Sequence, residues 1–221
     1  TMNEMTIEQV YVAGKSFGVN GNGYEPKGEV TFGSEIIDPL NHPELLFSAR
    51  IAAFCANARL SFQPDTNTWK IAGDPTEAAM LVFAEKIGFH HDTLERELPK
   101  IFELPFNYNQ KYHATIRRVD EKNFLTVSGA PETVLTLCNT FWQADGESHL
   151  SEEKRESLEA VFHKLARQGH RVIAYAVNSD TTPQVEATTM PPLSFVGFFG
   201  MNDALRAEVK AAVTHVRAAG M

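Results

Sequence analysis

Three stretches that lie far apart in the sequence carry acidic, aromatic and basic side chains in a fixed order. The first is Gly73-Asp-Pro-Thr-Glu-Ala-Ala-Met80, where Asp74 can N-cap a helix. Pro75 suits the first helical position and Gly88 provides a stop. Glu77 falls at the third helical position, where a carboxylate completes a capping box without any ligand. The alternative is that Glu77 accepts a hydrogen bond from an amino group of a ligand.

The second and third stretches supply a ring and positive charge. Phe106 ends a predicted strand beside a polar turn that runs to Lys111, so its ring can stay exposed and stack on a flat base. Core packing is the alternative for Phe106, and simple solvation is the alternative for Lys111. A hairpin then leads to Ser128-Gly-Ala-Pro-Glu132, and Arg171 begins a later strand, where a generic surface arginine is the competing interpretation. Together these groups would suit a ligand with a flat base and a highly charged tail.

Short strands and helices must position these side chains. Tyr112–Val119 alternates, a turn follows, and Phe124–Val127 returns, which predicts an antiparallel hairpin. We expect a polar loop before Trp69 and a solvated loop at His90-His91. The other predicted strands are 6–13, 29–32, 101–106, 172–177 and 193–200, and the predicted helices are about 41–58, 74–88, 131–138, 151–168 and 203–219.

Composition narrows the class of protein. The 221 residues carry a net charge of -8, which argues against general nucleic-acid binding. No run approaches the roughly 20 apolar residues of a membrane span, so we expect no direct membrane contact by this chain. Cys55 and Cys138 have apolar neighbours, which predicts buried, reduced thiols in a cytosolic setting.

Motifs for independent catalysis are incomplete. Gly14-Lys-Ser16 lacks the first glycine of a phosphate-binding loop, and no helix follows it as a Gly-x-Ser-x-Gly nucleophile would require. The adjacent histidines His90 and His91 have no second cluster of ligands. We therefore predict neither catalytic residues nor a metal site in this chain.

The ordered set resembles the nucleotide-binding (N) domain of P-type cation-transporting ATPases, especially the type II ion pumps. Thr1-Met-Asn-Glu-Met-Thr6 is similar to the segment after the phosphorylated aspartate, and Gly23-Tyr-Glu-Pro-Lys-Gly-Glu-Val30 to a Tyr-x-Pro-x-Gly-Glu-Val stretch of the family. Residues 195–221 resemble the return into the phosphorylation domain. The resemblance implies an α+β fold with a twisted, mainly antiparallel sheet flanked by helices. It also implies a hinge segment at 1–8, a nucleotide-binding domain at 9–192, and a return strand, hinge and helix start at 193–221.

The resemblance also assigns roles to individual residues. By it, Phe106 stacks on adenine, Glu77 approaches the adenine amino edge, Lys111 lines the pocket, Arg171 reaches the phosphates, and Gly129 and Ala130 let the backbone approach the ligand. Ser128 stands where the family usually has lysine, so the pocket loses one cation. Ala204-Leu205 stands where the family usually has two prolines.

The function that follows from the resemblance is ATP binding in the cytoplasmic part of an integral membrane pump. The expected partners are ATP or ADP and the phosphorylation and actuator domains, with Mg²⁺ expected only alongside the phosphorylation domain. The phosphorylated aspartate would precede Thr1, so we expect this chain to bind nucleotide without turning it over. The alternative is an interaction or regulatory module that has kept the shape and weakened or lost nucleotide binding.

Overall fold

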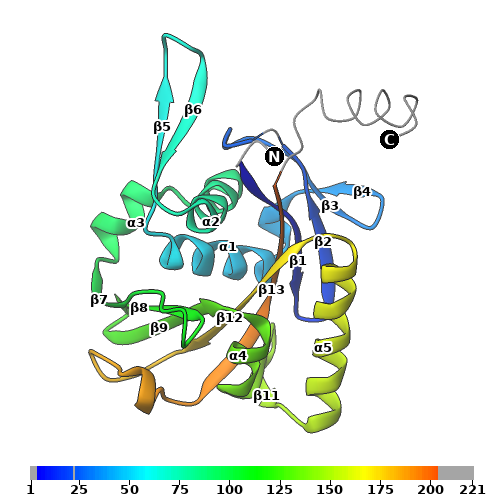
Figure 1. Cartoon of the computed structure of the whole chain (residues 1–221), viewed down its shortest axis with the longest axis vertical. Coiled ribbons are helices and arrows are strands. Elements are labelled where there is room, and N and C mark those ends of the chain that lie inside the picture. Colours follow the sequence, from blue (N-terminus) through cyan, green and yellow to red (C-terminus); the bar gives the residue numbers. More distant parts are fainter. Residues whose placement is uncertain (1–3, 22, 204–221) are drawn as a thin grey trace, which may run out of the picture.

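The computed structural model describes residues 4–21 and 23–203, and Figure 1 labels their helices and strands. The strands are β1 (Met5–Val12), β2 (Lys15–Val19), β3 (Val30–Phe32), β4 (Glu35–Ile37), β5 (Arg59–Gln63), β6 (Thr68–Ala72), β7 (Lys100–Leu104), β8 (Tyr112–Val119), β9 (Lys122–Gly129), β10 (Cys138–Gln143), β11 (Gly146–His149), β12 (Arg171–Asn178) and β13 (Leu193–Asp203). The helices are α1 (Pro43–Cys55), α2 (Pro75–Lys86), α3 (His91–Glu97), α4 (Pro131–Thr136) and α5 (Glu152–Arg167), with short 3₁₀ turns η1 (Pro39–Asn41) and η2 (Ala187–Thr189).

One sheet organises the described residues. It contains 11 strands, nine of them in the order β4-β3-β2-β1-β13-β12-β9-β8-β7, with β10 and β11 attached beside β13. Neighbouring strands pair antiparallel, except that β10 runs parallel to β13. The expected α+β class, with a mainly antiparallel sheet and flanking helices, is confirmed.

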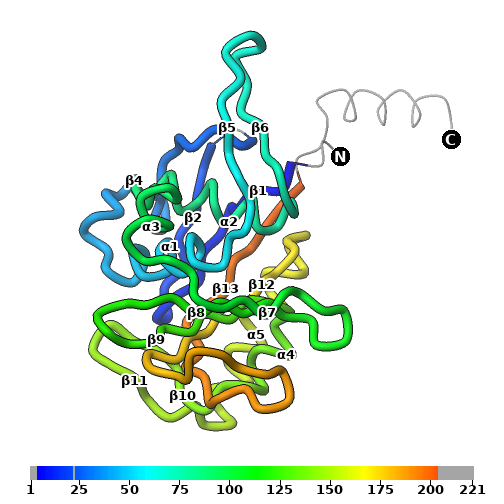
Figure 2. The backbone as a smooth tube through the Cα atoms, turned by 90° about the vertical axis from the view of Figure 1, so that its left-hand side faces the viewer, coloured from blue at the N-terminus to red at the C-terminus, as the bar shows by residue number. Residues whose placement is uncertain are grey.

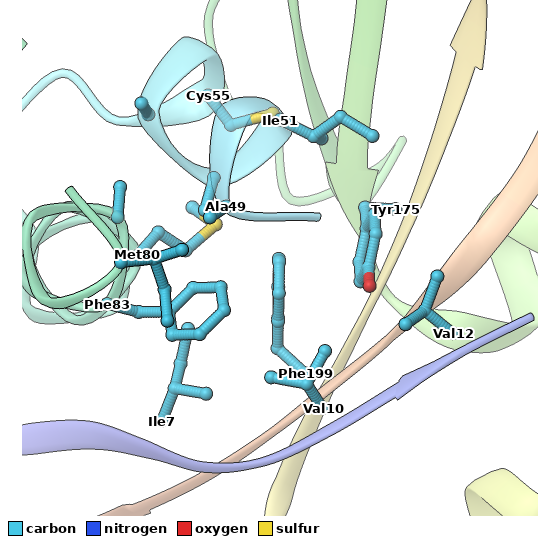
Figure 3. Packing of buried hydrophobic residues seen from close by; sticks show 14 of the residues in the cluster. Ile7, Val10, Val12, Ala49, Ile51, Cys55, Met80, Phe83, Tyr175 and Phe199 are labelled. Carbon is cyan, nitrogen blue, oxygen red and sulfur yellow. The ribbon is translucent and has the colours of Figure 1, made fainter. Parts of the chain in front are cut away.

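Helices cover both faces of the sheet because its central strands are apolar on both faces. Tyr175 of β12 and Phe199 of β13 stack at a centroid distance of 4.1 Å and face α1 and α2, as Figure 3 shows. Their neighbours Ala174 and Phe198 belong to the second core cluster, with α4 and α5. The sequence predicted this buried character for β12 and β13. Burial on both faces places the centre of the sheet between two layers of helices.

The two ends of the described chain meet in the sheet. Val10 of β1 lies opposite Phe199 of β13, so strands nearly 200 residues apart in sequence are neighbours. The domain boundaries at residues 8 and 192 stay a prediction. The helix expected from Asp203 to Ala219, with Ala204-Leu205, lies outside the described residues apart from Asp203.

Several elements differ from the sequence prediction, which also did not include β4, β10 and β11. The expected polar loop is instead the β5–β6 hairpin, which projects from the body in Figure 2. Phe62 and Trp69 pack together across it, with ring centroids 5.3 Å apart. His90 is the N-cap of α3 and His91 begins it, so the solvated loop was wrong for this segment. The helix predicted to Cys138 ends at Thr136, because Cys138 already pairs in β10.

Candidate functional site

A cavity of about 640 Å³ lies where four segments converge: the start of α2, the β7–β8 connection, the β9–α4 junction and the start of β12. All seven residues predicted from sequence line it: Glu77, Phe106, Lys111, Ser128, Gly129, Ala130 and Arg171. The other lining residues are Asp74, Thr76, Met80, Tyr108, His113, Pro131, Glu132, Phe162, Val172 and Ile173. The volume lies in the range of small-molecule and cofactor sites, about 300 to 1,000 Å³.

The N-terminus of α2 forms as predicted, with one change at Glu77. Asp74 Oδ1 accepts hydrogen bonds from the backbone N–H groups of Thr76 at 2.8 Å and Glu77 at 3.3 Å. The Glu77 carboxylate does not complete a capping box, because its Oε2 accepts instead from the backbone N–H of Asn57 at 3.0 Å. Asn57 lies just beyond the C-cap of α1, so Glu77 joins the two helices at the cavity.

The environment of Glu77 disfavours its charged form. Burial raises the pKa of the Glu77 carboxyl, and the charges of Asp74 and Glu103 act in the same direction. The charge of His113 and the hydrogen bond from Asn57 oppose that rise. A carboxylate has about four lone-pair positions, so the hydrogen bond to Oε2 leaves acceptor capacity for a ligand.

Aromatic rings stand open at the mouth of the same cavity. Phe106 follows β7 by two residues and is 50% exposed, so core packing is the wrong interpretation of this ring. Tyr108 is 89% exposed and meets Phe106 edge-to-face, with ring centroids 5.5 Å apart. A flat ring held half-exposed is the geometry that base stacking needs.

Two basic side chains flank the cavity. Lys111 adopts a left-handed backbone conformation with φ of 57°, and its N–H closes the turn onto the Asn107 carbonyl at 2.6 Å. Its Nζ lies 3.4 Å from Glu132 Oε1, and both side chains are exposed, so this ion pair is weak. Arg171 is exposed at the start of β12. Arg171 can therefore turn toward an anionic ligand, and Lys111 can do so at the small cost of its exposed pair with Glu132.

The β9–α4 junction explains why glycine follows Ser128. A Cβ at Gly129 would lie 2.4 Å from the Lys111 carbonyl oxygen and 2.6 Å from Tyr112 Cα. The expected reason for Gly129, close approach to a ligand, is thus joined by a requirement of strand packing. Ser128 is buried at this junction. Burial raises the pKa of the neighbouring Cys55 thiol to about 11, while the side chains of Thr126 and Ser128 oppose that rise.

Comparison with known proteins decides the family. The family model for the cytoplasmic N domain of P-type ATPases matches residues 45–208. The chain belongs to this family. It is 32% identical over its full length to a calcium-transporting ATPase of Bacillus subtilis, and 32% identical to the cation-transporting ATPase pma1 of Synechocystis. A calcium-transporting ATPase type 2C member 1 of Bos taurus is 28% identical, again over 100% of the chain.

This N domain is one part of the proteins that it matches. The chain spans 25% of the length of the two bacterial relatives and 22% of the bovine one. Within residues 4–21 and 23–203, no helix has the length and apolar character needed to cross a membrane. In the same described ranges, no group of three or more histidine, cysteine, aspartate or glutamate side chains could hold a metal ion.

Among the lining residues outside the predicted set, His113 and Phe162 come from elements whose part in the cavity of the N domain the sequence did not indicate. His113 lies on β8 opposite Ser128, and Phe162 lies on α5. The register of the predicted β8–β9 hairpin could have placed His113 beside Ser128, because residues directly opposite in a hairpin share a face. Phe162 shares the helical spacing of Leu158, Val161 and Leu165, a pattern typical of a helix face that packs on a core. The sequence therefore offered no separate signal that Phe162 lines a cavity.

Proposed function

We propose that this N domain binds ATP in the cavity and presents the γ-phosphate to an aspartate of a separate phosphorylation domain in a cation-transporting pump. In this proposal Phe106 stacks on adenine, the Glu77 carboxylate accepts from its exocyclic amine, and Lys111 and Arg171 face the phosphates. Ser128, Gly129 and Ala130 form the inner wall. Mg²⁺ and the actuator domain act with the phosphorylation domain, and the chain alone holds ATP or ADP without hydrolysis.

One observation carries the proposal. Residues from four segments, chosen from sequence alone, border a single cavity of about 640 Å³ beside a half-exposed phenylalanine. Chance placement would scatter such residues over the surface of a chain of 221 residues. Their chemistry is also complementary to ATP, because a ring, a carboxylate and two cations match a base, an amine and a polyphosphate.

The charges of the cavity favour weak binding. The three carboxyl groups of Asp74, Glu77 and Glu132 outnumber the two cations Lys111 and Arg171, so the cavity has no excess of positive charge for a polyphosphate. One stacked base and a few charge-assisted hydrogen bonds, less the cost of association, leave about -4 kcal/mol, which corresponds to millimolar affinity. A domain that must release ADP in every cycle is served by such an affinity.

Phe106→Ala tests the proposal directly. We expect it to weaken ATP binding by about 1 to 3 kcal/mol, the usual value of one base stacked on an aromatic ring. Phe62→Ala is the matched control, because Phe62 is 43% exposed and lies on the β5–β6 hairpin, away from the cavity lining. NMR titration with ATP measures both affinities and maps the shifts. Shifts far from Glu77, Phe106 and Lys111, or unchanged affinity in Phe106→Ala, would refute the proposal.

A second function is favoured by one observation, the buried Ser128 in place of the usual lysine. Its hydroxyl is buried and supplies no charge, which suits an interaction module that has lost nucleotide. The same titration separates the two functions. Absence of shifts at several millimolar ATP supports the interaction module, while phosphate release from ATP that survives Phe106→Ala contradicts both.

A further inference from the structure

A hydrogen-bonded network connects Glu77 to the far strand of the sheet. Glu77 Oε2 accepts from the Asn57 backbone N–H at 3.0 Å, so the carboxylate sits wherever Asn57 is held. The Asn57 side chain is fixed at both ends: Nδ2 donates to Glu103 Oε1 at 3.3 Å, and Oδ1 accepts from Lys100 Nζ at 3.4 Å. Glu103 and Lys100 both belong to β7, which forms the edge of the sheet.

Glu103 is the centre of this network. Its Oε2 accepts from Lys100 Nζ at 2.5 Å, and its Oε1 accepts from His113 Nε2 at 3.1 Å as well as from Asn57. Because a carboxylate only accepts, His113 Nε2 carries the proton in this contact. The His113 side chain is 5% exposed and borders the cavity. Its Nδ1 is buried without a hydrogen-bond partner in the described part of the chain.

The two glutamates of the network are tuned in opposite directions. Burial raises the pKa of the Glu103 carboxyl, but hydrogen bonds and charges from Lys100 and His113 outweigh burial and bring that pKa below its ordinary value. Glu103 is therefore a firm anion and a reliable acceptor. Burial dominates at Glu77, so its charged form depends on the partners that the network supplies.

We propose that Asn57, Glu103 and His113 are positioning residues that hold the Glu77 carboxylate in place for the exocyclic amine of adenine. The network connects the end of α1 with β7 and β8. It ends at Glu77, the carboxylate that is proposed to contact the amino edge of adenine. This inference rests on the proposed function, because it gives the network a role only if a nucleotide occupies the cavity.

The test compares two nucleotides in Glu103→Gln. ATP has the exocyclic amine, whereas purine riboside 5′-triphosphate lacks it and keeps the ring and phosphates. We expect Glu103→Gln to weaken ATP binding ~3- to 10-fold, the value of about one hydrogen bond, and to leave the binding of the amine-free nucleotide within about twofold. In a Glu77→Ala background the same substitution should change ATP affinity no further. NMR titration of the 221-residue chain measures each value.

Glu44→Gln is the matched control. Glu44 is a buried glutamate with a lysine and a histidine partner, Lys15 at 2.6 Å and His42 at 3.5 Å, and it lies outside the cavity lining. We expect this variant to lower stability and leave both nucleotide affinities unchanged. Equal weakening of both nucleotides by Glu103→Gln, or further weakening in the Glu77→Ala background, would overturn the positioning role alone. Absence of ATP binding by the wild-type chain would instead overturn the proposed function.

Discussion

Glu77 lines the cavity in an environment that disfavours its charged form. The carboxylate is half-buried at the start of α2, and burial raises its pKa. The folded state therefore holds a proton on Glu77 more tightly than the unfolded state does. The stability that this group contributes is fully present below the unfolded pKa and is lost as the pH rises through the folded pKa. At neutral pH, an ionised Glu77 opposes folding.

Glu77→Gln is therefore expected to raise the free energy of unfolding at pH 7. The amide oxygen can still accept from the Asn57 N–H, while the charge that burial disfavours is gone. The gain should shrink as the pH falls from the raised folded pKa toward the unfolded value of about 4.3, and it should be absent below that value, where both side chains are neutral. Urea denaturation at pH 7 and pH 4 measures the difference.

Glu44→Gln should change the free energy of unfolding in the opposite direction from Glu77→Gln. Burial raises the pKa of Glu44, but Lys15 and His42 outweigh burial and hold the pKa below its ordinary value. Its stability contribution is present above the unfolded pKa and is lost as the pH falls through the folded pKa. We expect this variant to be less stable than the wild-type chain at pH 7. If Glu44→Gln raised the free energy of unfolding at pH 7, as Glu77→Gln is expected to do, the opposite pKa shifts of the two carboxyl groups would be contradicted.

In the proposed function, Glu132 competes with a phosphate for Lys111. The two side chains are paired at 3.4 Å at the cavity wall, and such exposed pairs contribute about 0.2 to 1 kcal/mol. Glu132→Gln should strengthen ATP binding about two- to fivefold, since it frees Lys111 and removes a negative charge near the phosphates. Glu121→Gln is the control, because Glu121 makes a similar exposed pair with Arg118 at 3.5 Å outside the cavity lining. Weaker ATP binding in Glu132→Gln would show that this pair supports the site.

At the residue scale, the site candidates came from the order of their motifs, which resembles the family. Residue type alone left core packing open for Phe106 and plain surface positions open for Lys111 and Arg171, and the structure places all three at the cavity. His113 was not among the candidates, because its partner Glu103 is ten residues away on another strand and its role depends on register. The sequence singled out Glu77 but not its partner Asn57, because that contact joins two helices that the sequence does not relate.

At the scale of elements, the β9–α4 junction ties the shape of the cavity to strand packing. Gly129 lies opposite Tyr112 and close to the Lys111 carbonyl, which accepts from the Ala130 N–H at 2.9 Å. A side chain at Gly129 would push the β8 end and the turn of Lys111 outward. The cavity wall therefore depends on this glycine through the backbone.

Gly129→Ala should destabilise the fold by about 2 to 3 kcal/mol, since the new Cβ meets backbone atoms that cannot yield easily. It should also weaken ATP binding, because Lys111 moves with its carbonyl. Gly33→Ala is the control: its φ is 62° and no atom lies within 4 Å of the new Cβ. That variant measures only the backbone cost of about 1 to 2 kcal/mol. Thermal denaturation measures the loss of stability in both variants, and ATP titration measures their affinities. Equal losses of stability in Gly129→Ala and Gly33→Ala would exclude a steric clash at Gly129.

Elements with strong end signals were predicted well, and elements without them were missed. The cap at Asp74 and the left-handed Gly88 located α2 closely. The β5–β6 hairpin was missed because polar residues dominate its sequence. The alternation of Leu60 with Phe62, mirrored across the turn, is its only apolar pattern, and its aromatic pair forms across strands.

At the scale of the whole molecule, strand order was beyond sequence reasoning. The sequence predicted an α+β sheet, yet β1 pairs with β13 and β12 with β9, so contacts span most of the chain. Such long-range pairing depends on which faces each strand can bury, and single-sequence patterns do not specify partners. The resulting sheet brings α2, the β7–β8 turn and β12 to one cavity.

Because ATP is proposed to bind the folded domain and not the unfolded chain, ATP should stabilise the fold by mass action. With millimolar affinity, ~10 mM ATP adds RT ln(1 + [L]/Kd), or about 1.4 kcal/mol. For a chain of this size that corresponds to a rise in Tm of roughly 3 to 6 °C. Phe106→Ala should lose most of the rise, while tripolyphosphate at the same concentration, which lacks the base, controls for ionic effects. An equal rise with tripolyphosphate would mean that the basic side chains alone bind the ligand, and the aromatic ring would have no part in it.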